Sequence, residues 1–453
     1  MEREHLSDLF EKLAHRHRVP GAQLTVYRDG GLHEMTYGVE RSGTTRPVSP
    51  RSRFAFGSVS KVFTAALIMQ LVEEGEVDLD EPVPAYLATH RIAQGHPMHT
   101  VTLRHLLSHT AGLVSDHEGE PLRSASLRRY FASVLGTEQL LRPGTAFSYS
   151  NTGYAVAAYI VEAVTGQDWW ETLGSYLARP AGLDLAFIHD ARFPSAVADT
   201  VSGHAVHAAT GQVTPIDFYV ESTLAAAGGI AGSATDLVAF ARAFMGDDDT
   251  VPGTAIAGPD VLAEMGRSVT GADPFGLADG WGAGWGIFHA DGTRWLGHDG
   301  TLDGGTCNVR FDPIGGAAVA LTTNATSGLQ LWEELVVELR NAGLRIGHYC
   351  QPAPVGAAAG VGEQVTGDYT NGDLSISVTS DSTGALRFGV SNGFVGVLDA
   401  DPDLTFSVTS AERDQPLFSG RFLRAAGVFG PIESMQYNGR TLRRAAVARH
   451  LAA

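Results

Sequence analysis

Apolar residues follow different periodicities in different parts of the chain, and these periodicities predict its elements. Within the first eighteen residues, Leu6, Leu9, Phe10 and Leu13 are spaced like one face of a helix. Residues 22–27 and 32–38 look like two strands joined by the hairpin sequence Arg28-Asp29-Gly30-Gly31. The run that follows Ser58 is apolar with almost no polar face, which is typical of a buried helix. Glycine at position 75 ends this helix.

Helical and strand patterns then alternate along the rest of the first 350 residues. A short helix is expected over residues 102–109, a longer one from Tyr154 to about Thr165, and another after the capping residue Ser233. Short strands separated by glycine turns follow at residues 281–288, 293–297, 307–311 and 317–322. Strands at both ends with helices between them indicate a sheet completed by the two ends of one domain, with helices around it.

The C-terminal part of the chain has a different pattern. A Pro/Gly/Ala-rich segment, residues 351–362, reads as a linker. Beyond it, apolar residues alternate with polar ones in strands separated by turn residues (Leu374/Ile376/Val378, Leu386/Phe388/Val390, Leu404/Phe406/Val408). We therefore expect an antiparallel β module, a small barrel or sandwich. The predicted divisions are residues 1–348, a linker over 349–365, and residues 366–453.

Composition and charge narrow the function classes. The chain has 453 residues, of which 44% are hydrophobic and 18% are charged, so it can bury a large core. A formal charge of −18 disfavours nucleic acid and anionic membranes as partners. No export signal opens the chain and no apolar stretch of about 20 residues occurs, so we expect a cytoplasmic protein. The pairing of the two cysteines, Cys307 and Cys350, stays open.

Lysine usage points to one candidate catalytic residue. The chain has 32 Lys and Arg residues, of which only Lys12 and Lys61 are lysine. A lysine inside a buried helix can become a neutral amine, which arginine cannot, so Lys61 is a candidate general base. Ser58 lies three residues earlier, on the same helix face, where a lysine could activate it as a nucleophile. On this pattern alone, a buried lysine paired with a distant carboxylate is the better interpretation, because four-residue patterns recur by chance; the motifs further along the chain reverse that preference.

A second candidate site is formed by two histidines. His105 and His109 have the i, i+4 spacing of a metal-binding pair. No glutamate lies between them in the arrangement of zinc proteases, and no third ligand is evident. We therefore interpret both as packing residues, and we expect neither a metal nor a cofactor.

Three motifs occur in a fixed order along the chain. They are Ser58-Val59-Ser60-Lys61, Tyr149-Ser150-Asn151 and His298-Asp299-Gly300. Together they resemble the motif set of the serine β-lactamase and penicillin-binding protein superfamily, in the variant form of its class C β-lactamase, D-alanyl-D-alanine carboxypeptidase and esterase group. Flanking segments agree with this resemblance (residues 102–113, Arg142-Pro143-Gly144 and Ala227-Gly228-Gly229). It covers residues 10–345 and implies an α/β (α+β) fold: an antiparallel sheet flanked by helices plus an all-helical subdomain.

The resemblance implies a role for each motif residue. Ser58 would be the acylated nucleophile, with Lys61 and Tyr149 sharing the general base and acid work. Asn151 would bind the substrate amide and hold Lys61. His298 replaces the usual lysine of the family as a weaker, pH-dependent cation. The backbone N–H groups of Ser58 and Thr301 would form the oxyanion hole, and Gly300 and Gly229 would contact the substrate.

The expected location selects among the activities of the superfamily. Cell-wall enzymes and antibiotic-destroying β-lactamases work outside the cytoplasm. The chain is similar in size, layout and lysine-poor composition to the penicillin-binding-protein-type thioesterases, which are cytoplasmic and carry a C-terminal lipocalin-like β domain. These take a peptide with a C-terminal D-residue from a carrier protein onto serine, and the peptide's own amine closes a macrolactam ring. A peptidyl carrier domain is thus a candidate partner.

Two other functions remain open. The first is a cytoplasmic esterase or D-stereospecific amidohydrolase with water as the acceptor. The second is a non-catalytic binding protein that kept the fold, which the presence of both Ser58 and Lys61 disfavours.

The last 33 residues hold six arginines and one acidic residue, Glu433, in an otherwise acidic chain. Among these arginines we expect Arg440, after a turn, to reach the mouth of the site. Ion pairing of this basic face with the main domain explains it equally well.

Overall fold

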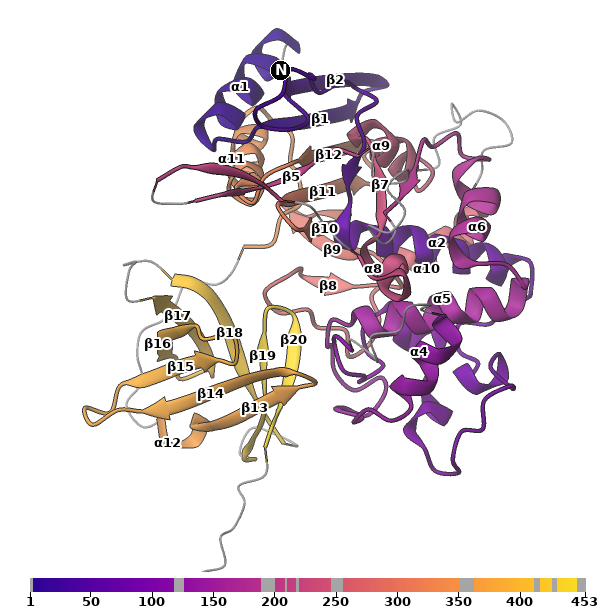
Figure 1. The fold of residues 1–453 in the computed structure, drawn as a ribbon, viewed down its shortest axis with the longest axis vertical. Helices are drawn as coiled ribbons and strands as arrows, with labels where there is room; N and C mark the ends of the chain where they lie inside the picture. Colours follow the sequence, from indigo (N-terminus) through magenta and orange to yellow (C-terminus); the bar gives the residue numbers. More distant parts are fainter. Residues whose placement is uncertain are drawn as a thin grey trace, which may run out of the picture.

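The computed structural model contains two bodies, a mixed α/β body and a closed β-barrel (Figure 1). The helices and the antiparallel sheet of the first body, followed by the barrel, confirm the predicted fold class. The structure describes residues 3–117, 126–188, 200–207, 210–216, 220–245, 256–350, 362–410, 416–425 and 430–445.

A seven-stranded antiparallel sheet forms the centre of the first body, with the strand order β2-β1-β12-β11-β10-β9-β8. The two ends of the body meet in it, because β1 pairs with β12 and Ala22 lies opposite Thr323. Every residue of β11 and β12 is buried, as expected of strands covered on both faces. The strands are β1 (Gly21–Arg28), β2 (Gly31–Gly38), β8 (Gly280–Trp281), β9 (Gly286–Ala290), β10 (Thr293–Leu302), β11 (Gly305–Asp312) and β12 (Ala317–Thr323).

Two terminal helices cover one face of the sheet. They are α1 (Arg3–Arg16) and α11 (Gly328–Asn341), which lie beside each other in Figure 1. The predicted apolar face of α1 is buried against the sheet and α11, with Phe10 fully buried and Trp332 nearly so. This layer holds both ends of the α/β body together.

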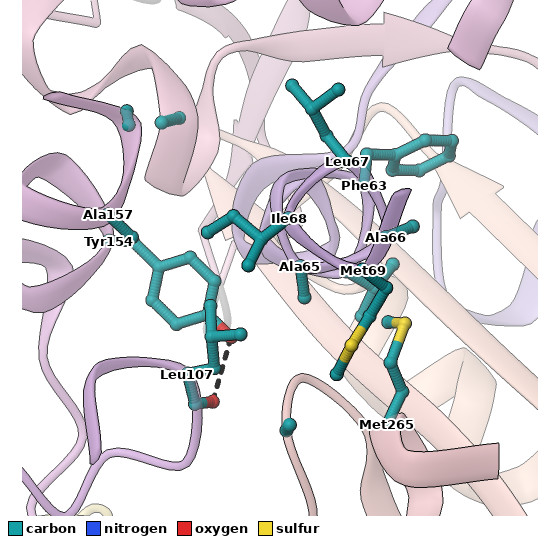
Figure 2. Packing of buried hydrophobic residues seen from close by; sticks show 14 of the residues in the cluster. Phe63, Ala65, Ala66, Leu67, Ile68, Met69, Leu107, Tyr154, Ala157 and Met265 are labelled. Atoms are coloured by element: carbon teal, nitrogen blue, oxygen red, sulfur yellow. Dashed lines mark hydrogen bonds between the residues drawn. The ribbon is translucent and has the colours of Figure 1, made fainter. Parts of the chain in front are cut away.

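The opposite face carries the helix that the sequence singles out. α2 (Ser60–Glu73) is buried from Ser60 to Met69, and Figure 2 shows its side chains packed on all sides, next to Tyr154 and Met265. A 3₁₀ turn, η1 (Gly57–Val59), leads into it and contains Ser58. The neighbouring helices are α8 (Ala225–Gly228), α9 (Ala234–Arg242) and α10 (Pro259–Gly266).

The remaining elements of this body form the helical region and two small sheets. The structure has α3 (Leu103–Leu107), α4 (Leu127–Val134), α5 (Asn151–Thr165), α6 (Trp169–Thr172), η2 (Val83–Ala85), η3 (Pro97–Thr100), η4 (Leu173–Ala178) and η5 (Ser222–Leu224). The small sheets contain β3 (Phe54–Ala55), β7 (Ile230–Gly232) and β4 (Ala186–Phe187), and β5 (Gly203–Val206) with β6 (Val213–Ile216).

The barrel has its own core, in which Tyr369, Phe388 and Met435 are fully buried. Most of the predicted linker, residues 351–361, lies outside the described residues. Its end differs from the prediction, because Gly362–Val365 form a helical turn, α12, with Val365 in the barrel core. The strands are β13 (Gly367–Asn371), β14 (Leu374–Ser380), β15 (Leu386–Val390), β16 (Val395–Ala400), β17 (Thr405–Ser410), β18 (Pro416–Arg424), β19 (Ile432–Tyr437) and β20 (Arg440–Arg444).

The structure resolves the state of the two cysteines, which the sequence left open. Cys307 is buried in β11 and Cys350 is exposed, and both are free thiols. Among the described residues, every helix is too short or too polar to cross a membrane.

Candidate active site

The turn before α2 presents Ser58 at a crossing with β10. Gly57 has a φ of +51°, a backbone conformation that favours glycine, and a side chain there would meet the backbone of Thr301. Ser60 faces the other way, where its hydroxyl accepts a hydrogen bond from the Ile230 backbone N–H at 3.0 Å. The left-handed conformation of Gly57 and this bond together fix the orientation of the Ser58 turn.

Lys61 lies one turn further into the helix and is fully buried. Its Nζ is 3.1 Å from Ser58 Oγ and donates a hydrogen bond of 2.7 Å to the Ala227 carbonyl. The same atom lies over two aromatic rings, 4.8 Å from the centroid of Tyr149 and 5.7 Å from that of Tyr154. Ser58, Lys61 and Tyr149 thus meet as the sequence predicts.

Burial sets the proton affinities of both groups beside Ser58. It lowers the pKa of Lys61 far below the usual lysine value; Asp116 opposes this effect and Arg440 adds to it. Burial also raises the pKa of Tyr149 well above its usual value, which the nearby Ser58 hydroxyl offsets only in part. The phenol therefore stays protonated at neutral pH while the amine is biased toward its neutral form. This arrangement suits a lysine base and a tyrosine acid.

His109 supports Tyr149, a role that the sequence analysis missed. Its ring stacks on the phenol ring at 4.2 Å between centroids. Its Nδ1 accepts a hydrogen bond of 3.0 Å from the Ser150 N–H, and its carbonyl accepts one of 2.8 Å from the Ser148 N–H. The packing role expected for His109 is therefore correct, and it serves the catalytic segment. His105 is used in the cap of α3, where its Nδ1 accepts from the Thr102 N–H.

The side chain of Asn151 is held differently from the expectation. No hydrogen bond between Asn151 and Lys61 occurs among the described residues; instead, the Asn151 amide donates to Asp116 Oδ1 at 2.6 Å. The carboxylate takes the amide because it is a charged acceptor, whereas Lys61 directs its N–H groups to Ser58 and Ala227. Asp116 is a second site residue that the sequence did not reveal, because nothing in its local pattern marks it.

Arg440 reaches the site from the barrel, and it also pairs with the main body. Its guanidinium binds Asp116 Oδ2 through Nη2 at 2.8 Å and Nε at 3.2 Å. Both interpretations of this residue thus hold at once, since Arg440 lines the pocket of Ser58 while it pairs with an acidic residue of the α/β body.

His298 on β10 lies in the pocket as an uncharged ring. Burial, helped by the charge of Lys61, lowers its pKa to about 3. This changes the expectation of a weak cation, since the ring is neutral at pH 7. Its Nδ1 donates to the Asp299 carbonyl at 2.7 Å, so the neutral ring keeps Nε2 as a bare acceptor. Nε2 has no hydrogen-bond partner among the described residues.

The charge next to His298 is held by a buried arginine. Arg310 binds Asp299 through Nη1 at 2.8 Å and Nη2 at 2.7 Å, and the Asn308 amide adds a bond of 2.7 Å. Burial raises the pKa of Asp299, but Arg310 and these hydrogen bonds lower it more, so its pKa lies below the usual value. The carboxylate stays ionised and fixes β10 against β11.

The predicted oxyanion donors lie where the Ser58 turn crosses β10. A side chain at Gly300 would come within 3.0 Å of the Ser58 backbone nitrogen, so this close approach requires glycine. Thr301 follows on the same strand and lines the pocket with Ser58. Ser58 and Thr301 therefore lie close together in the pocket, and the role of their N–H groups in the reaction stays a prediction.

One pocket of about 450 Å³ contains most of the predicted site residues. Ser58, Tyr149, Asn151 and His298 line it together with apolar side chains, and the barrel contributes Asn438 and Arg440. Gly229 is not among the described residues that line this pocket; its N–H and carbonyl bind Ala225 and Ile188. The described residues contain no group of three side chains able to hold a metal ion.

Comparisons with known proteins agree with this geometry. The profile of the beta-lactamase family matches residues 6–342. Penicillin-binding protein 4 of Amycolatopsis lactamdurans is 36% identical over 369 residues, which cover 78% of this chain and 95% of that protein.

Solved structures extend the likeness over nearly the whole chain. The structure of SurE has a TM-score of 0.88 and 41% identity, and covers 98% of this chain and 99% of SurE; SurE has also been solved with D-Leu. A D-stereospecific amidohydrolase from Streptomyces sp. shares the fold at a TM-score of 0.59 and 23% identity, covering 76% of this chain and 99% of its own. With its family match and its Ser58-x-x-Lys61 and Tyr149-x-Asn151 motifs in one pocket, the chain belongs to the β-lactamase and penicillin-binding protein superfamily of serine enzymes.

Proposed function

We propose that the protein is a penicillin-binding-protein-type thioesterase. In this proposal it takes a nonribosomal peptide with a C-terminal D-residue onto Ser58 and releases it as a head-to-tail macrolactam. The observation that carries the acyl-transfer step is the 3.1 Å approach of Ser58 Oγ to the buried amine of Lys61, beside the protonated phenol of Tyr149. These are the parts of an activated serine nucleophile.

Acylation follows from the proton affinities. The neutral Lys61 amine accepts the hydroxyl proton as Ser58 Oγ bonds to the thioester carbonyl carbon. The N–H groups of Ser58 and Thr301 stabilise the oxyanion, each contributing roughly 3–4 kcal/mol in comparable sites. When the carbon–sulfur bond breaks, Tyr149 protonates the thiolate, and Lys61 returns its proton to the phenol.

The acceptor decides the product. In macrolactam formation the peptide's own α-amine attacks the Ser58 ester, loses a proton and leaves an amide, while Ser58 Oγ is protonated again. The pocket provides room for the two ends of a peptide, because its lining runs from Ser58 to the barrel residues Asn438 and Arg440 on one side and to Leu329 and Glu333 of α11 on another. Apolar lining near Trp281 disfavours water as the acceptor.

The substrate class is supported by the relatives. SurE, at 41% identity over nearly the full chain, has been solved with D-Leu, and a D-stereospecific amidohydrolase has the same fold. Both agree with a D-residue at the acyl position. The proposal further takes a peptidyl carrier domain as the partner that delivers the thioester, and the cytoplasm as the place of action.

A second candidate is a D-stereospecific amidohydrolase or esterase, in which water replaces the amine. The bare Nε2 acceptor of the neutral His298 favours it, since this atom can hold a water molecule beside Ser58. The catalytic steps up to the acyl-enzyme are the same in both candidates.

The test uses a linear peptide thioester that ends in a D-residue, incubated with the protein and with Ser58→Ala and read by mass spectrometry. A cyclic product that disappears with Ser58→Ala supports the thioesterase. Linear acid alone would move the assignment to the hydrolase. Absence of any turnover dependent on Ser58, including on β-lactam and ester panels, would leave the fold as that of a binding protein.

A further inference from the structure

The segment that carries Tyr149 is bonded to the barrel through its backbone. The Tyr149 N–H donates to the Gly439 carbonyl at 2.9 Å. On β20, the Thr441 N–H donates to Ser148 Oγ at 3.1 Å, and Thr441 Oγ1 donates to the Phe147 carbonyl at 2.6 Å. The hairpin between β19 and β20 thus runs along three consecutive residues of the catalytic segment. In Figure 1 this hairpin faces the helical region of the α/β body.

Asn371, at the end of β13, anchors the same segment from a second strand. The residue is only 2% exposed, and its amide nitrogen donates to the Thr441 carbonyl at 2.9 Å and to Ser115 Oγ at 2.9 Å, with Ser148 Oγ at 3.3 Å sharing one of the two N–H groups. Its Oδ1 accepts from the Ser115 N–H at 2.8 Å. One barrel side chain therefore connects β20, the residue before Tyr149 and the residue before Asp116.

Attachment of the barrel to the α/β body would not by itself require a buried hydrogen-bond network with this geometry. A buried amide costs free energy unless all its hydrogen bonds are made, and an apolar residue of similar size would hold two surfaces together without that risk. A satisfied polar network fixes a single geometry, because a small shift leaves donors and acceptors unpaired. The hydrogen bonds of Asn371 are made to residues next to the site. Ser148 precedes Tyr149, and Ser115 precedes Asp116, which accepts the hydrogen bond from Asn151.

We propose that Asn371 is a positioning residue for acylation, which fixes the backbone that presents Tyr149 and Asn151 to Ser58. The barrel is then part of the machinery that forms the acyl-enzyme and not only a cover over the acceptor side. This inference rests on the proposed acyl-enzyme at Ser58, but it holds for either acceptor, amine or water.

The test compares Asn371→Asp with Asn392→Asp, the same change at an exposed turn of the same barrel. An aspartate at position 371 cannot donate to the Thr441 carbonyl, so the network opens. The rate of Ser58 labelling by a fluorophosphonate probe and the kcat on a peptide thioester are measured in the full-length protein. Asn371→Asp should lower both rates by about 10²-fold, the effect of a displacement near 1 Å, with KM little changed. Asn392→Asp should leave both rates unchanged.

A pH profile separates positioning from a general loss of structure. Release of the Tyr149 segment admits water to Lys61, so the acid limb of the labelling rate should move to higher pH. The charged and titratable groups around Lys61 are Tyr149, Tyr154, His109, His298, Asp116 and Arg440, and all of them remain in both variants. Because Asn371→Asp adds a carboxylate that would by itself raise the pKa of Lys61, the shift is assigned to positioning only where Thr441→Val, which adds no charge, shows it as well. Thr441→Val provides a milder second variant, with an expected loss of about 10-fold for one charge-free hydrogen bond to the Phe147 carbonyl.

The outcomes distinguish the inference from the function beneath it. Wild-type protein that is not labelled at Ser58 removes the acyl-enzyme and the inference together. Labelled wild-type protein with Asn371→Asp within threefold of it overturns the inference alone, as does an equal loss with Asn392→Asp. Should Asn371→Asp fail to fold, Thr441→Val decides, and an unchanged labelling rate and pH limb in that variant count against the proposal.

Discussion

The two sides of the active site are built in opposite ways. On the serine side, Ser58 lies in the turn before α2 and Lys61 three residues later in α2, which is packed in the main hydrophobic core. On the tyrosine side, Tyr149 and Asn151 precede and begin α5, in a segment held by side chains and backbone more than 200 residues later. The first side depends on local helix geometry and burial, and the second on the docking of the barrel.

This difference shows that the reactivity of Lys61 and the alignment of Tyr149 have separate physical causes. Burial in the core produces the low pKa of Lys61 and would do so in any protein that enclosed the lysine as fully. The position of the Tyr149 phenol depends on contacts from other segments. His109 stacks on its ring, and the hairpin between β19 and β20 binds its backbone N–H. A substitution on the serine side should therefore remove the base that activates Ser58, whereas a substitution in the contacts on the tyrosine side should displace Tyr149 from its catalytic position.

The largest effect is expected on the serine side. Lys61→Met keeps the volume of the side chain but removes the base, so acylation of Ser58 should fall by about 10³-fold. Lys12→Met, on the exposed face of α1, is the matched control and should acylate like the wild type. Stopped-flow acylation with circular dichroism checks both variants. Retention of more than a tenth of the rate by Lys61→Met would show that another group is the base.

A smaller effect is expected from the acid on the tyrosine side. Tyr149→Phe keeps the stacking on His109 and removes only the hydroxyl, so kcat should fall by about 10²-fold. Tyr369→Phe removes a buried hydroxyl from the barrel core, where it binds the Val365 carbonyl, and should leave kcat unchanged. Steady-state kinetics on thioesters with leaving thiols of different pKa gives the diagnostic. The loss should shrink as the thiol becomes more acidic, and an equal loss for all thiols would contradict an acid role.

The two sides communicate through charge, which predicts shifts of opposite sign. Lys61 acts as a base only when neutral, so activity is present above its pKa in the folded protein and is lost as the pH falls through that value. Asp116 raises this pKa and Arg440 lowers it. The acid limb of kcat/KM should therefore move to lower pH in Asp116→Asn and to higher pH in Arg440→Gln. Shifts in the same direction for both variants would exclude this coupling.

The smallest effect is expected at the rim between the two bodies. Arg443 and Glu138 form an ion pair across it at 3.2 Å, with both side chains more than half exposed. Arg443→Gln should change the free energy of unfolding by less than about 0.5 kcal/mol and leave acylation unchanged. Urea denaturation measures the first and probe labelling the second. A large loss of acylation here would mean that the rim, and not the buried amide of Asn371, sets the docking of the barrel.

The serine side of the site was easier to predict from the sequence than the tyrosine side. The Ser58 and Lys61 pair was predictable because helix periodicity places residues i and i+3 together, and the scarcity of lysine made Lys61 conspicuous. The sheet, the buried helix and the barrel strands were predictable from hydrophobic periodicity, which local sequence carries.

The parts that were missed depend on distant contacts. Asp116 and Asn371 have ordinary local surroundings, and only the folded chain brings them to Tyr149 and Asn151. The expected charge of His298 was wrong in a similar way, because burial by neighbouring elements, not residue type, keeps the ring neutral. Arg440 was found from a count of charges, but its partner Asp116 was not.

The pairing of β1 with β12 also determines when the central sheet can form during synthesis of the chain. Ala22 cannot meet Thr323 until the ribosome has added about 300 further residues, which takes on the order of 15–60 s at 5–20 residues per second. The central sheet therefore closes late, and β1 must wait with one edge open. Asn371 and the Gly439 turn are made later still. A nascent chain thus contains Ser58 and Lys61 long before it can align Tyr149, so catalytic competence should arise only after Asn371 and the Gly439 turn have been synthesised.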